Sequence, residues 1–550
     1  MSKVDSRRRR GGLRLACVAL GLTVMTTACG GGGTSSTGDA ADSGKPAKTS
    51  MSVAAGAIAE NIDPDAPSAV VVANYQTVKN VYEPLVRFGY QANDADLGGG
   101  LKLDTQKVEP ALATSWEYAD NAWTFKLREG VKSHAGNEFT SADVVWTYER
   151  SKALAATGAL LWTKFMGVSA VEAVDKYTVK FTTDGASPML LATMAVASYV
   201  RPIDSTEAKK HVTADDKWAA KWLGENAAGF GAYAISDWQR PRSITLQPRP
   251  DYWDAANSGN LAVTTQAVTN PAQRLNALTK GDVDIALGLT PQQVTTASQN
   301  DSLTVVKFNA NTRAFVYPNL DDSNIADVKV RQAMWTAVPT KDIIERVYNG
   351  DAFELKSPVS PYIAGYTDEF FRYDHSMEKA KALMAESSKP NGFKSELYYS
   401  SEEPILQQVA EILKSSWAQI GIDIQLKAEP NAQLQTRNFN NHDIPLYMED
   451  LGATEVPDAC SIGALWAKGG IANSNNYHDD TFNKAFEDCL DQVEFADREP
   501  AMKQLQKAAI DNPMVIPIVG LYSTTVIRSN VQNLAFDPSG ATPYRTVTVK

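Results

Sequence analysis

The sequence has little histidine or cysteine for its length, and what it lacks excludes several functions. Its 550 residues include five His, scattered along the chain, and four Cys. They do not form the closely spaced sets that zinc sites and HExxH metalloproteases need. GxSxG and phosphate-loop motifs are also missing. We therefore expect no metal site, no cofactor and no enzyme activity.

Positive charge is in short supply as well. The chain has 53 Lys and Arg against 64 Asp and Glu, which gives a net charge of -11. Because phosphate neutralisation needs clustered Lys and Arg, nucleic acid is excluded as a partner. Hydrophobic residues make up 43% and charged residues 21%, the usage of folded proteins, and the length indicates several lobes.

Apolar runs long enough to span a membrane are missing after the N-terminus. The chain begins with basic residues up to Arg14 and a short apolar run, Leu15–Met25, which together predict an export signal over residues 1–28. Thr26 to Cys29 resemble a lipobox, in which the Cys sulfur receives diacylglycerol, although Thr26 stands where Leu, Val or Ile is usual. We expect lipidation at Cys29; simple secretion is the alternative.

Residues 29–50 differ from the rest of the chain. They are mostly Gly, Ser, Thr, Ala, Asp and Lys, a composition that cannot bury enough apolar surface to fold. This stretch predicts a flexible linker to a membrane anchor. The residues before Cys29 hold six basic side chains and one acid, so their removal changes the net charge from -11 to -16.

Two cysteines, Cys460 and Cys489, remain after the signal and the lipid site. An exported chain makes a disulfide between them plausible, and the cross-link would stabilise the fold by roughly 3 to 4 kcal/mol. The alternative is two buried thiols, because Cys489 shares a helical face with Phe482 and Phe486.

Strand and helix patterns alternate along the body, which predicts an α/β fold. Period-two alternation indicates strands around Trp123–Leu127 and Tyr177–Phe181, and further strands are expected at 282–287, 303–308 and 314–317. Helical spacing over 405–420 ends at Gly421 and is followed at once by a strand from Ile422.

Two enzyme-like motifs fail on context. Gly229–Ala234 matches a loose dinucleotide fingerprint, but a helical pattern precedes it and strands follow, the reverse of the order required. Ser376–Lys379 matches SxxK, but Ser376 stands where a helix N-cap belongs and no KTG follows.

A series of ordered motifs resembles the family 5 extracellular solute-binding proteins, the peptide and nickel receptors of ABC importers. The motifs lie between about residues 60 and 520, and seven blocks occur in the family's order. They are Val81–Arg87, Glu109–Trp116, Trp123–Val131 with Phe139–Val145, Gly229–Tyr233, Asp251–Trp253, Leu275–Ile285 and Val328–Ala333.

The resemblance implies a two-lobed periplasmic-binding-protein-like fold (type II, large cluster C). Lobe one would span 51–311, with an extra subdomain at 105–225, and lobe two would span 312–512. Residues 513–550 would return to lobe one, and crossing segments near 313–319 and 512–520 would form the hinge. The implied protein is exported and lipid-anchored to the outer face of the cytoplasmic membrane. Its partners would be a small-molecule or peptide solute and ABC permease subunits, and we expect a monomer.

Solute-contacting residues are also implied by the resemblance. Peptide-binding relatives use an Asp in a Gly-Trp-x-Ala-Asp-Tyr segment to bind the peptide ammonium, and Glu455 takes that place here, with Gly452 at the Trp. The nearby acids Asp450 and Asp458 are further candidates, although this stretch also fits a solvated acidic loop. Two regions elsewhere supply the remaining candidates, which are Asn74, Tyr75 and Trp162.

The solute class stays open between several possibilities. Oligopeptides or dipeptides are the leading class, with a β-glucoside or another oligosaccharide next, because aromatic side chains suit both. A nickel chelate is a further alternative within the same receptor role. An exported enzyme on the same fold is the alternative from another class, and it would need converging nucleophile and base residues in the cleft.

Overall fold

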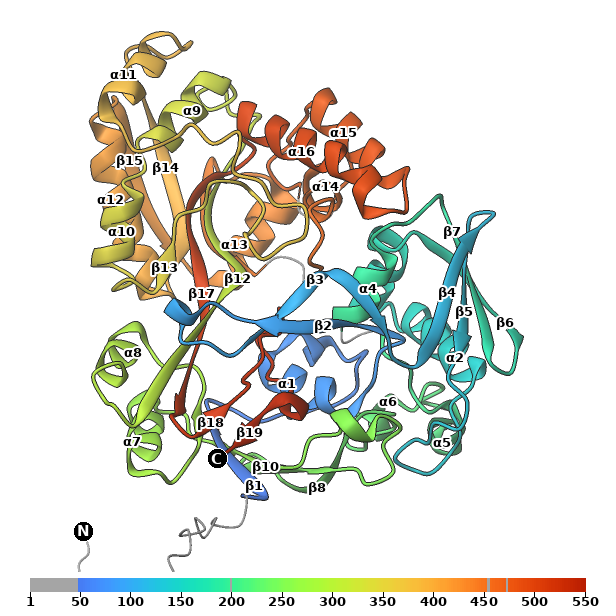
Figure 1. Cartoon of the computed structure of the whole chain (residues 1–550). Coiled ribbons are helices and arrows are strands. Elements are labelled where there is room, and N and C mark those ends of the chain that lie inside the picture. Colours follow the sequence, from blue (N-terminus) through green and yellow to red (C-terminus); the bar gives the residue numbers. More distant parts are fainter. Residues whose placement is uncertain (1–47, 198–199, 453–455, 471–472) are drawn as a thin grey trace, which may run out of the picture. The chain divides into compact units, whose positions relative to one another are not determined.

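The computed structural model describes residues 48–197, 200–452, 456–470 and 473–550 (Figure 1). These residues belong to one unit that spans 47–550. Cys29, the expected signal peptide and most of the expected linker lie outside the described residues, as does Glu455. No helix in the described ranges is long and apolar enough to cross a membrane.

Two long antiparallel strands, β12 (Leu303–Pro318) and β17 (Ile516–Arg528), form the centre of the main sheet. The strand order is β15-β14-β16-β12-β17-β11-β1-β10-β9-β8, with β13 also paired to β17. The strands predicted at 303–308 and 314–317 are confirmed as strand, but they are parts of one continuous strand, β12. The polar residues between them continue in extended conformation, and the β12–β17 register shifts between Asn309 and Arg313.

The other strands of this sheet fall on the two sides of the β12–β17 pair (Figure 1). On the β17 side lie β11 (Ile285–Ala286), β1 (Ser50–Ala55), β10 (Ala262–Ala267), β9 (Ser243–Pro248) and β8 (Tyr233–Gln239). On the β12 side lie β16 (Leu446–Gly452), β14 (Phe393–Ser400) and β15 (Ile422–Glu429), and β13 is Ala352–Phe353.

Helices cover both halves of the sheet. On the β1 side they are α1 (Val72–Val81), α5 (Ser205–Ala208), α6 (Ala220–Leu223), α7 (Pro271–Lys280) and α8 (Pro291–Ala297). On the β14 side they are α9 (Val328–Thr336), α10 (Thr340–Arg346), α11 (Met377–Ala385), α12 (Pro404–Ala418) and α13 (Asn431–Gln435).

The predicted helix–glycine–strand step is confirmed at α12. The apolar face of this helix buries Val409, Leu413 and Trp417 against the sheet, which explains its stability in the fold. Gly421 has a φ of +85°, a conformation that disfavours any side chain, and β15 begins at the next residue. Ser376 caps α11, as predicted, by accepting a hydrogen bond from the Lys379 amide.

A second sheet forms a separate subdomain, in the order β4-β5-β7-β6. Phe125 of β5 and Phe181 of β7, both predicted strand residues, are fully buried with ring centroids 5.3 Å apart. The elements of this part are β4 (Ala113–Ala119), β5 (Ala122–Leu127), α2 (Ser141–Ala153), α3 (Thr157–Leu160), β6 (Val168–Asp175), β7 (Thr178–Thr183) and α4 (Leu190–Val196).

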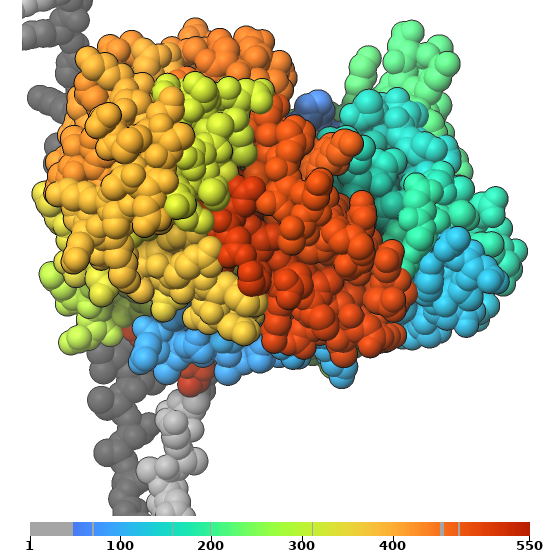
Figure 2. Space-filling model, turned by 90° about the horizontal axis from the view of Figure 1, so that it is seen from above, coloured from blue at the N-terminus to red at the C-terminus, as the bar shows by residue number. Residues whose placement is uncertain are grey.

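Three further helices, α14 (Ser461–Trp466), α15 (Asp480–Leu490) and α16 (Phe495–Asp511), lie next to this subdomain. Figure 2 shows the orange-red surface of α15 and α16 beside the cyan surface of the subdomain. A groove of about 620 Å³ runs between them, with Asp184 on one wall and Glu487 on the other.

A hairpin of β2 (Val86–Ala92) and β3 (Leu101–Pro110) crosses between the two halves of the sheet. The Thr105 hydroxyl donates a hydrogen bond to the Tyr362 carbonyl, 3.3 Å away, on the segment that follows β13. The Tyr362 ring also packs edge-on against Phe536, 5.5 Å between centroids. These contacts join the hairpin and the C-terminal segment to the segment after β13.

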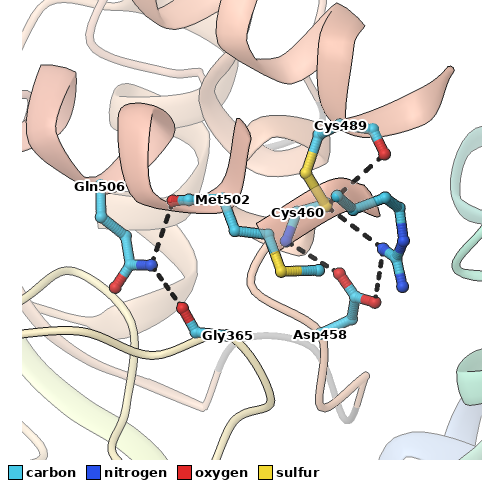
Figure 3. Close-up of a disulfide and its surroundings, with 7 residues drawn as sticks. Gly365, Asp458, Cys460, Cys489, Met502 and Gln506 are labelled. Carbon is cyan, nitrogen blue, oxygen red and sulfur yellow. Dashed lines mark hydrogen bonds and ion pairs between the residues drawn. A yellow bond between two sulfur atoms is a disulfide. The ribbon is translucent and has the colours of Figure 1, made fainter. Parts of the chain in front are cut away.

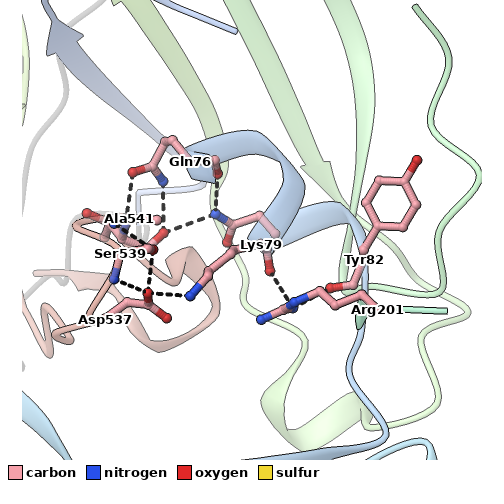
Figure 4. Close-up of polar contacts among 9 residues, drawn as sticks. Gln76, Lys79, Tyr82, Arg201, Asp537, Ser539 and Ala541 are labelled. Carbon is pink, nitrogen blue, oxygen red and sulfur yellow. Dashed lines mark hydrogen bonds and ion pairs between the residues drawn. The ribbon is translucent and has the colours of Figure 1, made fainter. Parts of the chain in front are cut away.

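The C-terminal segment folds back onto α1 (Figure 4). Lys79 of α1 forms an ion pair with Asp537, 2.6 Å between Nζ and Oδ1. The Gln76 amide group donates to the Thr542 carbonyl at 2.9 Å and accepts from the Thr542 amide at 2.8 Å. These bonds fix the last residues, which end in the small pair β18 (Val531–Gln532) and β19 (Thr548–Val549).

A buried ion network connects α2 to the segment before α1. The Arg150 guanidinium contacts Asp63 at 2.6 Å and Asp65 at 2.5 Å, and all three side chains are at most 3% exposed. Burial raises the pKa of Asp65 to about 6 although Arg150 lies beside it. Removal of one partner from such a network leaves an uncompensated buried charge.

Arg150→Ala should therefore reduce the free energy of unfolding by about 3 to 5 kcal/mol. Urea unfolding followed by tryptophan fluorescence measures this change. Lys152→Ala is the matched control, because Lys152 lies on the same helix and is exposed. If the two variants unfold at the same urea concentration, the ion network does not stabilise the fold.

Candidate functional site

The strand directions bring two sets of carboxyl ends to the same zone of the molecule. β1, β10 and β11 are parallel to one another and run in the same direction as β12. β14, β15 and β16 are also mutually parallel but run against β12. Both sets therefore end near residues 309–313, where the β12–β17 register shifts. Because ligands of open α/β sheets bind outside the carboxyl ends of strands, we place the candidate site here.

Glu449 lies near the carboxyl end of β16, on the sheet face that also carries Tyr447. The Tyr447 hydroxyl and the Gln435 amide donate to its Oε2 at 2.8 and 3.0 Å. Its Oε1 is buried without a hydrogen-bond partner among the described residues. Burial raises the pKa of Glu449, and Glu403 raises it further.

Asp450 projects from the opposite face of β16, since successive strand residues alternate. Its Oδ1 is buried, and no described residue donates a hydrogen bond to it. Burial, with the nearby charges of Glu403 and Glu449, raises the pKa of Asp450 to about 7. An acid held in this state at neutral pH is typical of functional sites.

Arg313 is a buried cation on β12, 1% exposed, in a strand register opposite Leu451. Its guanidinium donates to the Pro358 carbonyl and lies 5.1 Å from the centre of the Phe315 ring. No ion pair links it to a carboxylate within the ranges that the structure describes, and its Nε has no partner there. Burial lowers the pKa of Arg313 to about 10.

Tyr317 connects the acid and the cation electrostatically. Burial raises the pKa of Tyr317, Glu449 raises it further, and Arg313 opposes the rise. Its hydroxyl is thus within the field of both charges, on the face shared with Tyr447, whose ring centroid is 6.1 Å away. Along this sheet face Glu449 lies opposite Phe315, with Arg313 on one side of that pair and the two tyrosines on the other. The face therefore presents a cation and an acid close together, which suits a solute that carries both charges.

Asp458 has a different environment from Asp450. One of its oxygens accepts from Arg498 at 2.8 Å and the other accepts from the Cys460 amide at 2.9 Å (Figure 3). A disulfide joins Cys460 to Cys489 on α15. The charge of Asp458 is therefore compensated, and the residue anchors the start of α14 beside the candidate site.

The segment after β13 is fixed against the same anchor. Gln506 of α16 donates to the Gly365 carbonyl at 2.7 Å, and Ala364 forms a β-bridge with Asp458 (Figure 3). Gly365 has a φ of +85°, and an added Cβ would lie 2.4 Å from the Met502 sulfur. This packing positions the segment that supplies the Pro358 carbonyl to Arg313.

The other predicted contact residues lie in packed surroundings. Asn74, 3% exposed, donates to the Ser68 carbonyl at 2.6 Å and accepts from the Glu60 amide at 3.1 Å. Trp162, 1% exposed, stacks on Phe181 with centroids 5.9 Å apart, so core packing accounts for it. Tyr75 is 7% exposed in the same core cluster. No cluster of three His, Cys, Asp or Glu that could hold a metal occurs within the described part of the chain.

Sequence reasoning did not single out Arg313, Tyr317 or Glu449 as a group. One sequence pattern points to these residues, because each is a charged residue next to an apolar strand pattern. Arg313 precedes Ala314–Tyr317, and Glu449 follows Leu446–Met448. Only the pairing of β12 with β16 shows that these charges share a face.

Comparison with known proteins gives the class of this one. Residues 107–474 match the model of bacterial extracellular solute-binding proteins, family 5. Because the match covers most of the chain, the protein belongs to that family. The fold is accordingly the two-lobed α/β fold of periplasmic binding proteins, as the sequence predicts.

Relatives of known name support the assignment. The chain is 25% identical over 468 residues to the probable D,D-dipeptide-binding periplasmic protein DdpA of Escherichia coli K12, covering 83% of this chain and 86% of that protein. It is 25% identical over 472 residues to heme-binding protein A of Haemophilus influenzae, covering 82% and 85%. The binding protein DppA of Helicobacter pylori, solved with the peptide STSA, superposes with a TM-score of 0.72 at 23% identity, covering 92% and 98%.

The raised pKa of Asp450 predicts a pH dependence of stability. The folded state holds a proton on Asp450 up to about pH 7, whereas the unfolded chain releases it near its ordinary value of 3.8. The folded state therefore binds more protons between these values, and stability falls as the pH rises through this window. Asp450→Asn should flatten this fall.

Thermal unfolding of the solute-free protein at pH 5 to 8 measures the effect, in steps of about one pH unit. Asp301→Asn is the control, since Asp301 is exposed and carries no comparable burial. If the melting temperatures of wild type and Asp450→Asn change with pH in the same way, the pKa of Asp450 is not raised in the folded state.

Proposed function

We propose that the protein is the extracellular substrate-binding lipoprotein of an ABC importer, and that it captures oligopeptides or dipeptides and delivers them to a membrane permease. The observation that carries the proposal is the pair of uncompensated charges, Glu449 and Arg313, on one sheet face at the meeting of the carboxyl ends. The peptide ligands named for relatives support it.

The two ends of a peptide carry charges opposite to those of Glu449 and Arg313. Its α-ammonium would bind Glu449, whose Oε1 has no described partner. Its α-carboxylate would bind the Arg313 guanidinium. Such charge-assisted bonds read the ends of a peptide and leave its side chains free to vary. Glu455, three residues beyond β16, remains a proposed further contact.

We infer that capture involves closure of two lobes. Lobe one comprises residues 51–311, including the subdomain at 105–225, together with 513–550, and lobe two comprises 312–512. β12 passes from lobe one into lobe two, and β17 pairs with it on both sides of the register shift, so these two strands would form the hinge. Closure is favoured when a solute binds the closed form more tightly than the open one, so lobe one would add contacts to those of Glu449 and Arg313 in lobe two.

The role at the membrane follows from the N-terminal sequence. Cleavage before Cys29 and lipidation of its sulfur would anchor the chain to the outer face of the cytoplasmic membrane, with residues 29–50 as a tether. We propose a monomeric receptor that presents its solute to permease subunits in the same membrane.

Cys29→Ser should move the mature protein from the membrane fraction into the soluble fraction. The reason is that a serine cannot accept the thioether-linked lipid. Cell fractionation followed by immunoblotting measures the distribution, and Cys17→Ser, within the signal, is the matched control. Retention of Cys29→Ser on the membrane would exclude the lipid anchor.

Native mass spectrometry of residues 30–550, purified gently, tests the solute class. The proposal predicts a heterogeneous set of short peptides released on denaturation. A single glycan, a nickel chelate or heme would overturn the peptide assignment and leave the receptor role in place.

Glu449→Gln should weaken binding of a free-amine dipeptide by about ten-fold or more, as expected for loss of a hydrogen bond to a charged group. The same dipeptide with an acetylated amine should bind wild type weakly and lose little further affinity in the variant. Isothermal titration calorimetry gives the four affinities, with Asp301→Asn as the control. Equal losses for both dipeptides would contradict ammonium recognition by Glu449.

A further inference from the structure

Lobe one contains a cavity of about 350 Å³, and neither Glu449 nor Arg313 is among its lining residues. It lies at the carboxyl ends of β1 and β11, below the start of α1, and none of its lining residues comes from β14, β15 or β16. Most of the lining is apolar, including Ala55, Ile58, Leu246 and Leu287. Its volume suits a small organic ligand.

The position of the cavity is the one where open α/β sheets bind ligands. β1 pairs in parallel with β10 on one side and with β11 on the other. The chain passes from β10 through α7 to β11, on either side of β1, so α7 and the loop after β1 come together beyond the carboxyl end of β1. Residues 55–59, which follow β1, line the cavity.

Arg274 of α7 gives the cavity a positive charge. It is 4% exposed, and its guanidinium donates to the carbonyls of Val268 at 2.6 Å, Thr269 at 3.1 Å and Gly288. Its Nε has no hydrogen-bond partner, and no carboxylate pairs with it, in the described ranges. Neutral carbonyls do not compensate a buried cation, so an anion is the missing partner.

The start of α1 adds a second attraction for an anion. Its N-cap residue, Val71, provides no side-chain cap for the amide groups of the first turn. Helix N-termini favour negative charge for this reason and through the helix dipole. Val71 and Val72 line the cavity and are 50% and 53% exposed, so apolar surface lies open beside it.

We propose that this cavity binds a small monocarboxylate with a branched aliphatic tail, with the carboxylate on Arg274 and the tail against the apolar lining. The anion compensates the buried guanidinium, and the tail covers the alanine, isoleucine and leucine surface. The group is either a free carboxylic acid or the carboxyl-terminal residue of a peptide, and in the second case the peptide carboxylate binds Arg274 in place of Arg313. Its binding does not depend on Glu449 and goes beyond the proposed recognition of peptide termini by lobe two.

Ligand-observed NMR titration of residues 30–550 with isocaproate and with its neutral amide tests the proposal. Wild type should bind isocaproate at least about ten-fold more tightly than the amide, since a charge-assisted bond contributes that much. Arg274→Met should remove the preference. The matched control is Arg242→Met, because Arg242 is an exposed arginine of the same lobe.

A second variant covers the case in which Arg274→Met fails to fold. A Cβ on Gly56 would lie 3.5 Å from the Arg274 Nη1, an ordinary contact, so Gly56→Val fills the site and leaves the carbonyl clamp intact. Gly56→Val should bind neither isocaproate nor its amide, while its melting temperature stays close to that of wild type. Equal binding of acid and amide by wild type, or unchanged binding by Gly56→Val, would overturn the proposal.

Competition then separates the two sources of the carboxylate. A dipeptide ending in leucine displaces isocaproate if the natural group is the end of a peptide solute, and it leaves isocaproate bound if the group is a free acid. Glu449→Gln should not change the affinity for isocaproate. If this variant loses as much isocaproate affinity as Arg274→Met does, the cavity does not bind the acid independently of Glu449.

Discussion

The pairing of β12 with β17 is the constraint on which the rest of the structure depends. These two strands extend from the β1 half of the sheet to the β16 half, and each half is built outward from them. Their direction sets the direction of every neighbour and so brings two sets of carboxyl ends together near residues 309–313. The shift in register at this point separates the two paired stretches, as a hinge requires. A change in either strand would therefore disturb both lobes and the site between them.

The buried ionisable residues near the ends of these strands do not stabilise the fold. Glu449, Asp450 and Arg313 have buried atoms without described partners, and uncompensated buried charges destabilise a fold. By contrast, Asp458 is paired with Arg498 and joined through Cys460 to a disulfide, so its charge stabilises the scaffold. β16 and the segment after it thus contain acids of two kinds, and those without a described partner are the ones that a solute could bind.

Much of the fold could be predicted from the sequence, because it depends on local patterns. Alternation at Trp123–Leu127 and the helix that ends before Gly421 are confirmed, since one buried face fixes each period. The separate strands expected at 303–308 and 314–317 are one strand, because tertiary pairing extends it through polar residues.

The candidate site was less predictable. It is made by contacts between residues far apart in the chain, such as Arg313 and Glu449, which only strand register can bring to one face. Asn74 and Trp162 are residue types that suit solute contact. Both are buried, however, where Asn74 hydrogen-bonds to the Ser68 carbonyl and Trp162 stacks on Phe181. Glu455 lies outside the described residues.

Closure of the two lobes can be tested by measuring the distance between them with and without solute. Spin labels at Asp184→Cys and Glu487→Cys face the groove between the subdomain and α15, and both positions are exposed. Pulsed electron spin resonance on residues 30–550 would give the distance distribution before and after saturation with a peptide that binds. Closure about β12 and β17 predicts a shift to a shorter and narrower distribution. An unchanged distribution with peptide bound would contradict closure about β12 and β17.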